Sequence, residues 1–320
     1  MVYKCCHAMA KIKFMPSPSA HGAAEFVEKI ENDIRKSGFP LEMFVLNVCS
    51  TKNTGRMPSV RYEYLDKLRE IDLLAFFETI AASHHTSTDL IIECKKSSEK
   101  PWVFFSTPSY KFDSVASFIK YASDFDAYFG KRGFVPLLAQ IYPGLKVGHY
   151  SDSGVPRCVS YYEAFRSTSA PSEIYGAIDS VITYLNYRRS SRLKASEEFG
   201  TFSEFYLPVI VLDGNLFEAT VELDQVSVRA RPHIQLRTFH KEDIYIIDVV
   251  LRDHFQQFFD EVSKFHDEIV RCIASLSLPK EFKTAAQAKH KELIGPPDTD
   301  GRLAMAFARV GQKRRKLVKA

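Results

Sequence analysis

Two carboxylates and one ammonium group lie within apolar segments of the sequence, where charged side chains are uncommon. Residues 69–77 read REIDLLAFF and residues 90–96 read LIIECKK, and both segments are short and apolar enough to be buried strands. Side chains alternate along a strand, so Glu93 and Lys95 face the same side, and Asp72 on a neighbouring antiparallel strand can converge on them. A half-buried cluster of this composition is costly unless it pairs internally or binds a cation. The types and spacing of these residues therefore indicate a site that holds a divalent metal ion against a phosphate.

Asp89 is a second candidate for the first carboxylate. It lies on the same run as Glu93 and close before it, so it cannot supply a ligand from a neighbouring strand. Residues 78–89 are polar and are expected to form a long connection between the two strands. We therefore interpret Asp89 as a turn residue or the first residue of its strand, and Asp72 as the metal ligand.

The surrounding segments predict the elements that would position these residues. A helix is predicted at 40–49, because Pro40 suits a first helical turn and apolar side chains follow at helical spacing. This helix carries Glu42 near its start, where the carboxylate could face the cluster. Strands are expected at 58–65, 69–77, 90–96 and 101–105.

The order Asp72, then Glu93-Cys94-Lys95 on the next strand, resembles the signature of the PD-(D/E)XK nuclease superfamily, whose core is a helix followed by consecutive strands. The resemblance extends over residues 38–105. Within the superfamily, this segment is similar to uncharacterised bacterial members. It implies an α/β fold of the restriction-endonuclease-like type, with a mixed central sheet flanked by helices and a C-terminal α+β extension.

The resemblance also implies a metal-dependent nuclease that hydrolyses phosphodiester bonds, with DNA as the favoured substrate. Asp72 and Glu93, together with the backbone carbonyl of Cys94, would hold Mg²⁺ or Mn²⁺. Lys95 would orient the attacking water and stabilise the charge that develops on the phosphate, and Glu42 would be an additional ligand. A different class of function stays open: a catalytically inactive nucleic-acid-binding or interaction protein that retains the nuclease-like fold, in which Lys95 only forms a buried ion pair with Asp72 or Glu93.

Basic residues give a second, weaker indication of a nucleic-acid partner. The net charge of +4 does not by itself indicate one. Local clusters are better candidates for phosphate contacts, and we name Lys96 and the group Arg188, Arg189 and Arg192 at the end of a predicted helix. Cations also suit the C-terminal end of a helix because of its dipole, so this alternative stays open.

The composition is typical of a globular protein, with 45% hydrophobic and 26% charged residues, and no apolar run is long enough to cross a membrane. The six cysteines lack Cys-x-x-Cys spacing, which argues against a structural zinc site and fits a reducing compartment. No Gly-rich phosphate loop and no Gly-x-Ser-x-Gly motif occurs, so a serine hydrolase has no support. We expect a cytoplasmic protein without a membrane partner, and its oligomeric state, a homodimer included, stays open.

The pattern along the chain predicts a disordered leader at 1–20, a nuclease-like core at 21–145, an α+β extension at 146–278 that continues or packs on the core, and a polar, basic tail at 279–320. Outside the segments already described, further elements are expected as follows: helices at 22–37, 113–130, 161–166, 174–192 and 254–275, a hairpin over 205–221 that turns at Asp213-Gly214-Asn215, and strands at 133–142, 234–239 and 244–251. Asp248, an acid within the last of these strands, is given a structural role.

Overall fold

The computed structural model describes residues 20–81, 84–107, 119–123, 154–167, 171–194, 201–241 and 243–275. The chain divides into two compact units, Met1–Pro40 and Leu41–Ala320. The predicted strand at 133–142, the predicted tail and all but the last residue of the predicted leader lie outside the described residues.

The described part of the first unit is essentially one helix, α1 (Ala20–Lys36). Phe26, Ile30 and Ile34 recur at helical spacing and so share one side of it. The helix ends before Ser37-Gly38, where the Ser37 hydroxyl donates to the Ile34 carbonyl at 2.7 Å. The predicted helix at 22–37 is confirmed.

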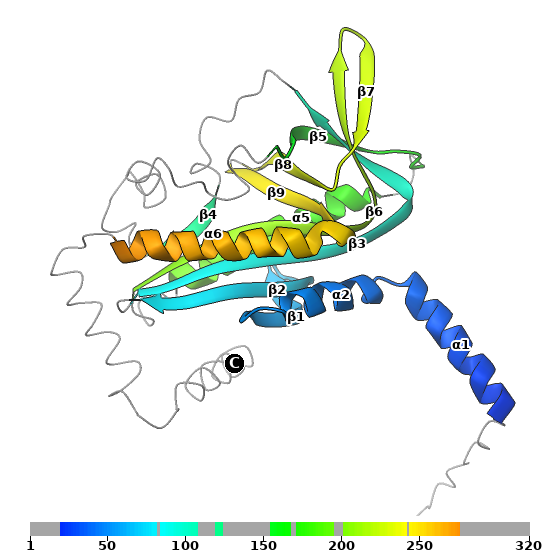
Figure 1. The fold of residues 1–320 in the computed structure, drawn as a ribbon, viewed down its shortest axis with the longest axis horizontal. Helices are drawn as coiled ribbons and strands as arrows, with labels where there is room; N and C mark the ends of the chain where they lie inside the picture. Colours follow the sequence, from blue (N-terminus) through cyan, green and yellow to red (C-terminus); the bar gives the residue numbers. More distant parts are fainter. Residues whose placement is uncertain are drawn as a thin grey trace, which may run out of the picture. The chain divides into compact units, whose positions relative to one another are not determined.

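The second unit is built on one mixed sheet, which contains nine strands among the described residues (Figure 1). Neighbouring strands are antiparallel except in the pairs β3–β6, β5–β8 and β6–β9, which are parallel. The strands are β1 (Gly55–Tyr64), β2 (Lys67–Ala81), β3 (His84–Ser106), β4 (Lys120–Ser123), β5 (Arg157–Glu163), β6 (Thr201–Glu222), β7 (Gln225–Ala230), β8 (His233–His240) and β9 (Asp243–Leu251). The expected class, an α/β fold with a large mixed sheet flanked by helices, is confirmed.

The two longest strands, β3 and β6, run side by side through the middle of this sheet. They pair in parallel from His84–Thr201 to Phe105–Ala219. On its other edge β3 pairs first with β2 and then with β5, and β6 pairs in turn with β4, β9 and β7. In addition, β5 pairs with β8, β8 with β9, and β9 with β6. Together with β3, these strands therefore form a closed ring of pairings. Residues 93–95 of β3 are held by residues 210–212 of β6, which fixes the backbone where the predicted site lies.

Two apolar layers cover the opposite faces of the sheet. On one face, α2 (Phe39–Cys49) and α6 (Phe255–Ser275) pack against side chains such as Leu73 and Ile92, and α6 runs along the sheet in Figure 1. On the other face, α5 (Glu173–Lys194) packs against side chains such as Ile91 and Ile210. Each large apolar side chain that becomes fully buried contributes about 1.5–3 kcal/mol, so these layers are sufficient to hold the helices on the sheet. The helices predicted at 40–49, 174–192 and 254–275 and the strands predicted at 234–239 and 244–251 are confirmed.

Residues 220–227, the end of β6 and the first half of β7, form a two-stranded arm that extends away from the other strands (Figure 1). Its turn is Leu223-Asp224, with φ values of 45° and 68°, as the tight turns of twisted hairpins require. The pair Val221–Val226 lies on one face of the arm and Glu222–Gln225 on the other. The arm therefore has an apolar face and a polar face. Every residue of β7 is exposed, so its side chains on both faces are accessible to solvent.

Two predicted strand breaks are wrong. The hairpin expected at Asp213-Gly214-Asn215 does not form, because β6 continues through these residues. Gly214 lies opposite Ser97 of β3, and a methyl group at position 214 would collide with the Ser97 carbonyl oxygen. The glycine thus permits a close approach of two strands instead of a turn. Residues 101–105 likewise continue β3 after an irregular stretch of pairing and are not a separate strand.

Three further local predictions are wrong where the structure describes them. Within the helix predicted at 113–130, only 119–123 are described, and Lys120–Ser123 form strand β4 against β6. Residues 161–163 of the short helix predicted at 161–166 belong to β5. The long connection expected at 78–89 is absent, because β2 extends to Ala81 and β3 begins at His84. In each case pairing with a neighbouring strand overrides the local sequence preference.

Candidate active site

Asp72 lies where the regular pairing of β2 is interrupted. Pairing with β3 ends at Leu73, and pairing with β1 passes over Ser59, whose φ is 48°. The Asp72 side chain replaces the missing backbone pair, because the Cys94 N–H donates to its Oδ2 at 2.7 Å. A hydrogen bond to a charged acceptor is shorter and stronger than one between neutral groups. It therefore fixes the carboxylate against β3.

Glu93 and Lys95 lie next to this junction on β3. Their side chains share the face covered by α5, and Lys95 Nζ donates to Glu93 Oε1 at 2.6 Å. The Glu93 side chain is nearly fully buried, whereas that of Lys95 is partly exposed. Glu93 Oε2 is buried and has no close hydrogen-bond partner within the described part of the chain, although hydrogen bonding by Ser180 of α5 lowers the pKa of this carboxylate. One oxygen of the carboxylate is therefore held by Lys95, and a serine of α5 lies beside the group.

The pKa values show that the four predicted catalytic residues share one electrostatic environment. Burial, followed by the Asp72 charge, raises the pKa of Glu93 from 4.5 to about 7, against the opposing effect of Lys95. Burial also raises the pKa of Asp72, although the Cys94 N–H and Lys95 oppose the shift. Burial and then the Asp72 charge raise the pKa of Glu42 on α2. Two nearby carboxylates that resist ionisation favour a cation between them.

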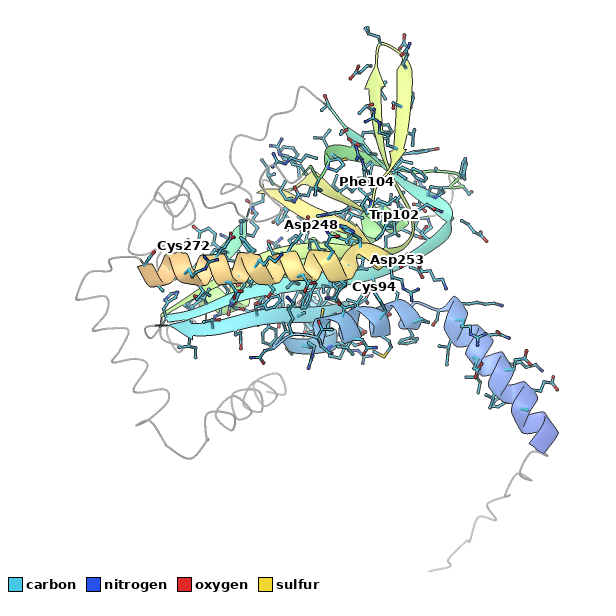
Figure 2. The ribbon with its side chains drawn as sticks, viewed as in Figure 1. Cys94, Trp102, Phe104, Asp248, Asp253 and Cys272 are labelled. Carbon is cyan, nitrogen blue, oxygen red and sulfur yellow. The ribbon has the colours of Figure 1, made fainter. Side chains whose placement is uncertain are left out.

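The structure thus brings Asp72, Glu93 and Lys95 together beside the backbone of Cys94, and Glu42 lies close enough for the charges of Asp72 and Lys95 to act on its pKa. Figure 2 labels Cys94, whose thiol packs in the apolar layer between α2 and α6 while its N–H reaches Asp72. The charges of all four residues act on this thiol, and burial raises its pKa well above the usual range. The thiol is consequently a packing group, and the backbone of Cys94 is the part that faces the site.

Residues that the sequence interpretation missed form the wall of the site toward α5. Arg69 of β2 pairs with Asp179 of α5, with 2.8 Å between Nη1 and Oδ2. Tyr62 of β1 is buried beside it, and its ring contacts Tyr184 and Tyr187 with centroid distances of 5.0 and 5.1 Å. No motif marks these residues. The only sign in the structure is that Tyr62 is buried within a strand whose other residues are mostly exposed, directly opposite Arg69.

The arginine cluster predicted to contact phosphate is turned inward. Arg188 Nη2 lies 3.0 Å from Asp89 Oδ2, and Arg192 Nε lies 2.7 Å from Glu204 Oε1. Arg189 donates to the Tyr121 carbonyl at 3.0 Å. Asp89 is therefore neither a turn residue nor the first residue of its strand, but a fully buried partner for Arg188 inside β3. These contacts hold α5 on the sheet, and of the residues named for phosphate contact only Lys96 is exposed.

Asp248, labelled in Figure 2, is fully buried in β9. Its Oδ1 lies 2.8 Å from His233 Nε2 and accepts a hydrogen bond from Gln235 Nε2 at 3.1 Å. Both partners come from β8, so the carboxylate links two strands, as expected for a structural role.

Within the described residues, no group of three or more His, Cys, Asp or Glu side chains is arranged to hold a metal ion. Asp72 and Glu93 instead offer two carboxylates beside a backbone segment. Mg²⁺ keeps several waters and is usually bound through one or two carboxylates, so the donors that are present fit Mg²⁺ better than a metal that needs a full protein cage. None of the described helices is both long and apolar enough to span a bilayer.

The chain was compared with protein-family models, curated proteins and solved structures. None of them matches it. The assignment of function therefore depends on the site itself.

Proposed function

We propose that this protein is a metal-dependent nuclease that hydrolyses phosphodiester bonds, with DNA as the favoured substrate. The observation that carries the proposal is the convergence of Asp72, Glu93 and Lys95 where β2 and β3 separate. Asp72 and the buried Glu93 repel each other when both are ionised, so a cation bound between them would relieve this repulsion. This donor set is the kind that holds Mg²⁺ against a phosphate.

The residues would then act as follows. Asp72 and Glu93, with the Cys94 carbonyl, would hold Mg²⁺ or Mn²⁺, and Glu42 would be an additional ligand. A divalent cation bound there polarises the phosphate and lowers the pKa of water. Lys95, released from Glu93, would orient the water and stabilise the charge that develops on the phosphate.

The order of elements supports a restriction-endonuclease-like core. Along the chain, α2 carries Glu42, β2 carries Asp72 and β3 carries Glu93 and Lys95, in the order that the PD-(D/E)XK signature implies. A cytoplasmic location is supported by the buried free thiols of Cys49, Cys94, Cys158 and Cys272, which a reducing compartment would preserve.

A catalytically inactive nucleic-acid-binding or interaction protein is the alternative. It is favoured by the 2.6 Å ion pair between Lys95 and Glu93, which offsets part of the buried charge without a metal. The two functions differ in one measurable respect, because only the nuclease needs the carboxylates to bind a divalent cation.

Thermal unfolding with and without Mg²⁺, together with cleavage assays on duplex DNA, single-stranded DNA and RNA, tests the proposal. Mg²⁺ should raise the melting temperature of the wild type, and Asp72→Asn and Glu93→Gln should abolish both this increase and cleavage. Glu78→Gln, an exposed carboxylate on the same strand as Asp72 and outside the electrostatic environment of the site, is the matched control and should retain both. A wild type that neither responds to Mg²⁺ nor cleaves any substrate would reject the nuclease in favour of the alternative.

A further inference from the structure

Three buried polar atoms beside the candidate site have no hydrogen-bond partner within the described residues. They are Tyr62 Oη, Arg69 Nε and Glu93 Oε2. Buried polar atoms are almost always hydrogen-bonded, and an unsatisfied one lowers stability. The first two atoms are donors and the third is an acceptor. Such a set suggests that the protein keeps these groups for a ligand.

The strand register places the two donors together. Tyr62 of β1 is directly opposite Arg69 of β2, so their side chains share one face at neighbouring positions. The Tyr62 hydroxyl is held in place by its ring, which packs edge-to-face on Tyr184 at 5.0 Å. Asp179 occupies Nη1 of Arg69 and leaves the Nε–H without an acceptor. Neighbouring side chains therefore fix the positions of both donors, while the Tyr62 hydroxyl and the Arg69 Nε–H have no acceptor within the described residues.

The third atom belongs to the same neighbourhood. Glu93 faces α5, as do Tyr62 and the Arg69–Asp179 pair. The charges of Arg69 and Glu93 both act on the Tyr62 hydroxyl. The guanidinium and hydroxyl thus border the carboxylate that is proposed to bind the metal ion.

We propose that Tyr62 and Arg69 bind a non-bridging oxygen of a substrate phosphate and form the phosphate-binding wall of the site. The substrate's identity rests on the nuclease function proposed above. A phosphate oxygen accepts hydrogen bonds from a hydroxyl and a guanidinium at once, and the planar guanidinium matches phosphate geometry. Asp179 is a positioning residue, because it acts on the phosphate only through Arg69.

Isothermal titration of the full-length protein with inorganic phosphate and with thymidine 5′-monophosphate, in metal-free buffer, tests this wall separately from the metal site. Tyr62→Phe removes a single oxygen and should weaken binding of both probes about tenfold, the change that one lost hydrogen bond of about 1.4 kcal/mol produces. Arg69→Lys keeps the charge but loses the Nε–H, and should weaken binding by at least as much. Tyr184→Phe, the neighbouring ring of the same aromatic group, is the control and should bind like the wild type.

Thermal unfolding without phosphate provides a second readout. Since the Tyr62 hydroxyl has no protein partner, Tyr62→Phe should be at least as stable as the wild type. Weaker phosphate binding in a variant of undiminished stability supports the wall, and this holds even if Arg69→Lys does not fold. Equal affinity in wild type and Tyr62→Phe, or no phosphate binding by the wild type, overturns it.

The two proposals fail in different ways. Loss of phosphate binding in Tyr62→Phe, without any Mg²⁺ response or cleavage by the wild type, supports a phosphate site and rejects the nuclease. Cleavage that requires Asp72 and Glu93, with unchanged phosphate affinity in Tyr62→Phe, supports the nuclease and rejects the wall.

Discussion

The Nζ of Lys95 lies 2.6 Å from Oε1 of Glu93, on the same strand and the same face of the sheet. The glutamate side chain is 7% exposed and the lysine side chain 30%. The ammonium group therefore stands beside Glu93 where a metal ion would also have to stand. Metal binding and this ion pair compete for one carboxylate.

Replacing Lys95 with methionine should lower stability without metal and enlarge the stabilisation by Mg²⁺. Removing one partner of a fully buried pair costs about 3–5 kcal/mol, and the partial exposure of Lys95 reduces this to about 1–2 kcal/mol. Mg²⁺ then no longer has to displace an ammonium group. Melting temperatures with and without Mg²⁺ measure both effects, with the exposed neighbour Lys96→Met as control. An unchanged metal-free stability, or a smaller response to Mg²⁺, would contradict this competition.

Glu93 should make the metal-free protein less stable as the pH rises from 4.5 to about 7, the range between its ordinary and its raised pKa. Burial, followed by Asp72, disfavours the ionised form, so the folded state binds this proton more tightly than the unfolded state. The stability from Glu93 is therefore complete below pH 4.5 and is lost as the pH passes through about 7. A shift of this size corresponds to on the order of 3 kcal/mol. Urea unfolding at pH 5 and pH 8 in the presence of a chelator should show a larger loss in wild type than in Glu93→Gln, and equal losses would refute it.

Arg188→Met should strongly destabilise the protein. Asp89 is fully buried beside the guanidinium, so the variant leaves it without its cation, whereas Glu204 keeps its pair with Arg192. The expected cost is about 3–5 kcal/mol. Arg61→Met breaks an exposed pair with Glu70 and should cost less than about 1 kcal/mol. Chemical denaturation of the two variants compares them directly, and similar costs would show that the interior pair is not needed for folding.

Two glycines should respond to alanine in opposite directions. At Gly214 the added methyl group meets the Ser97 carbonyl oxygen, so Gly214→Ala should destabilise by about 1–3 kcal/mol. Gly176 is an exposed position in α5 with no atoms within 4 Å of the added group, so Gly176→Ala should stabilise by about 1 kcal/mol. Denaturation midpoints report both. A stabilising Gly214→Ala would mean that β3 and β6 do not approach each other closely there.

The sequence allowed the elements with strong periodicity to be predicted. The helices α2, α5 and α6 carry apolar side chains at helical spacing, and β8 and β9 are short apolar runs. The Asp-Gly-Asn segment was misinterpreted because a glycine that permits two strands to meet looks the same in the sequence as a glycine in a turn. Only the position of Ser97 in space distinguishes them.

The candidate site was partly predictable for a similar reason. Alternation along β3 places Glu93 and Lys95 on one face, and a neighbouring β2 brings Asp72 close, so local pattern was sufficient. The pairing of Arg188 with Asp89, far away in the sequence, depends on how α5 lies on the sheet. The same dependence on the packing of α5 hid Tyr62 and Arg69, whose role follows from register and from Asp179.

The two-stranded arm at residues 220–227 has a consequence for local unfolding of the protein. An isolated pair of strands is only marginally stable in water, and β7 pairs with no strand except β6 within the described residues. The arm can therefore separate while the apolar layers under α5 and α6 stay intact. Its amide protons should exchange with solvent through this local opening, at rates that do not follow the free energy of global unfolding. The Cys94 amide, bonded to the Asp72 carboxylate in the interior, should exchange only when the whole sheet unfolds.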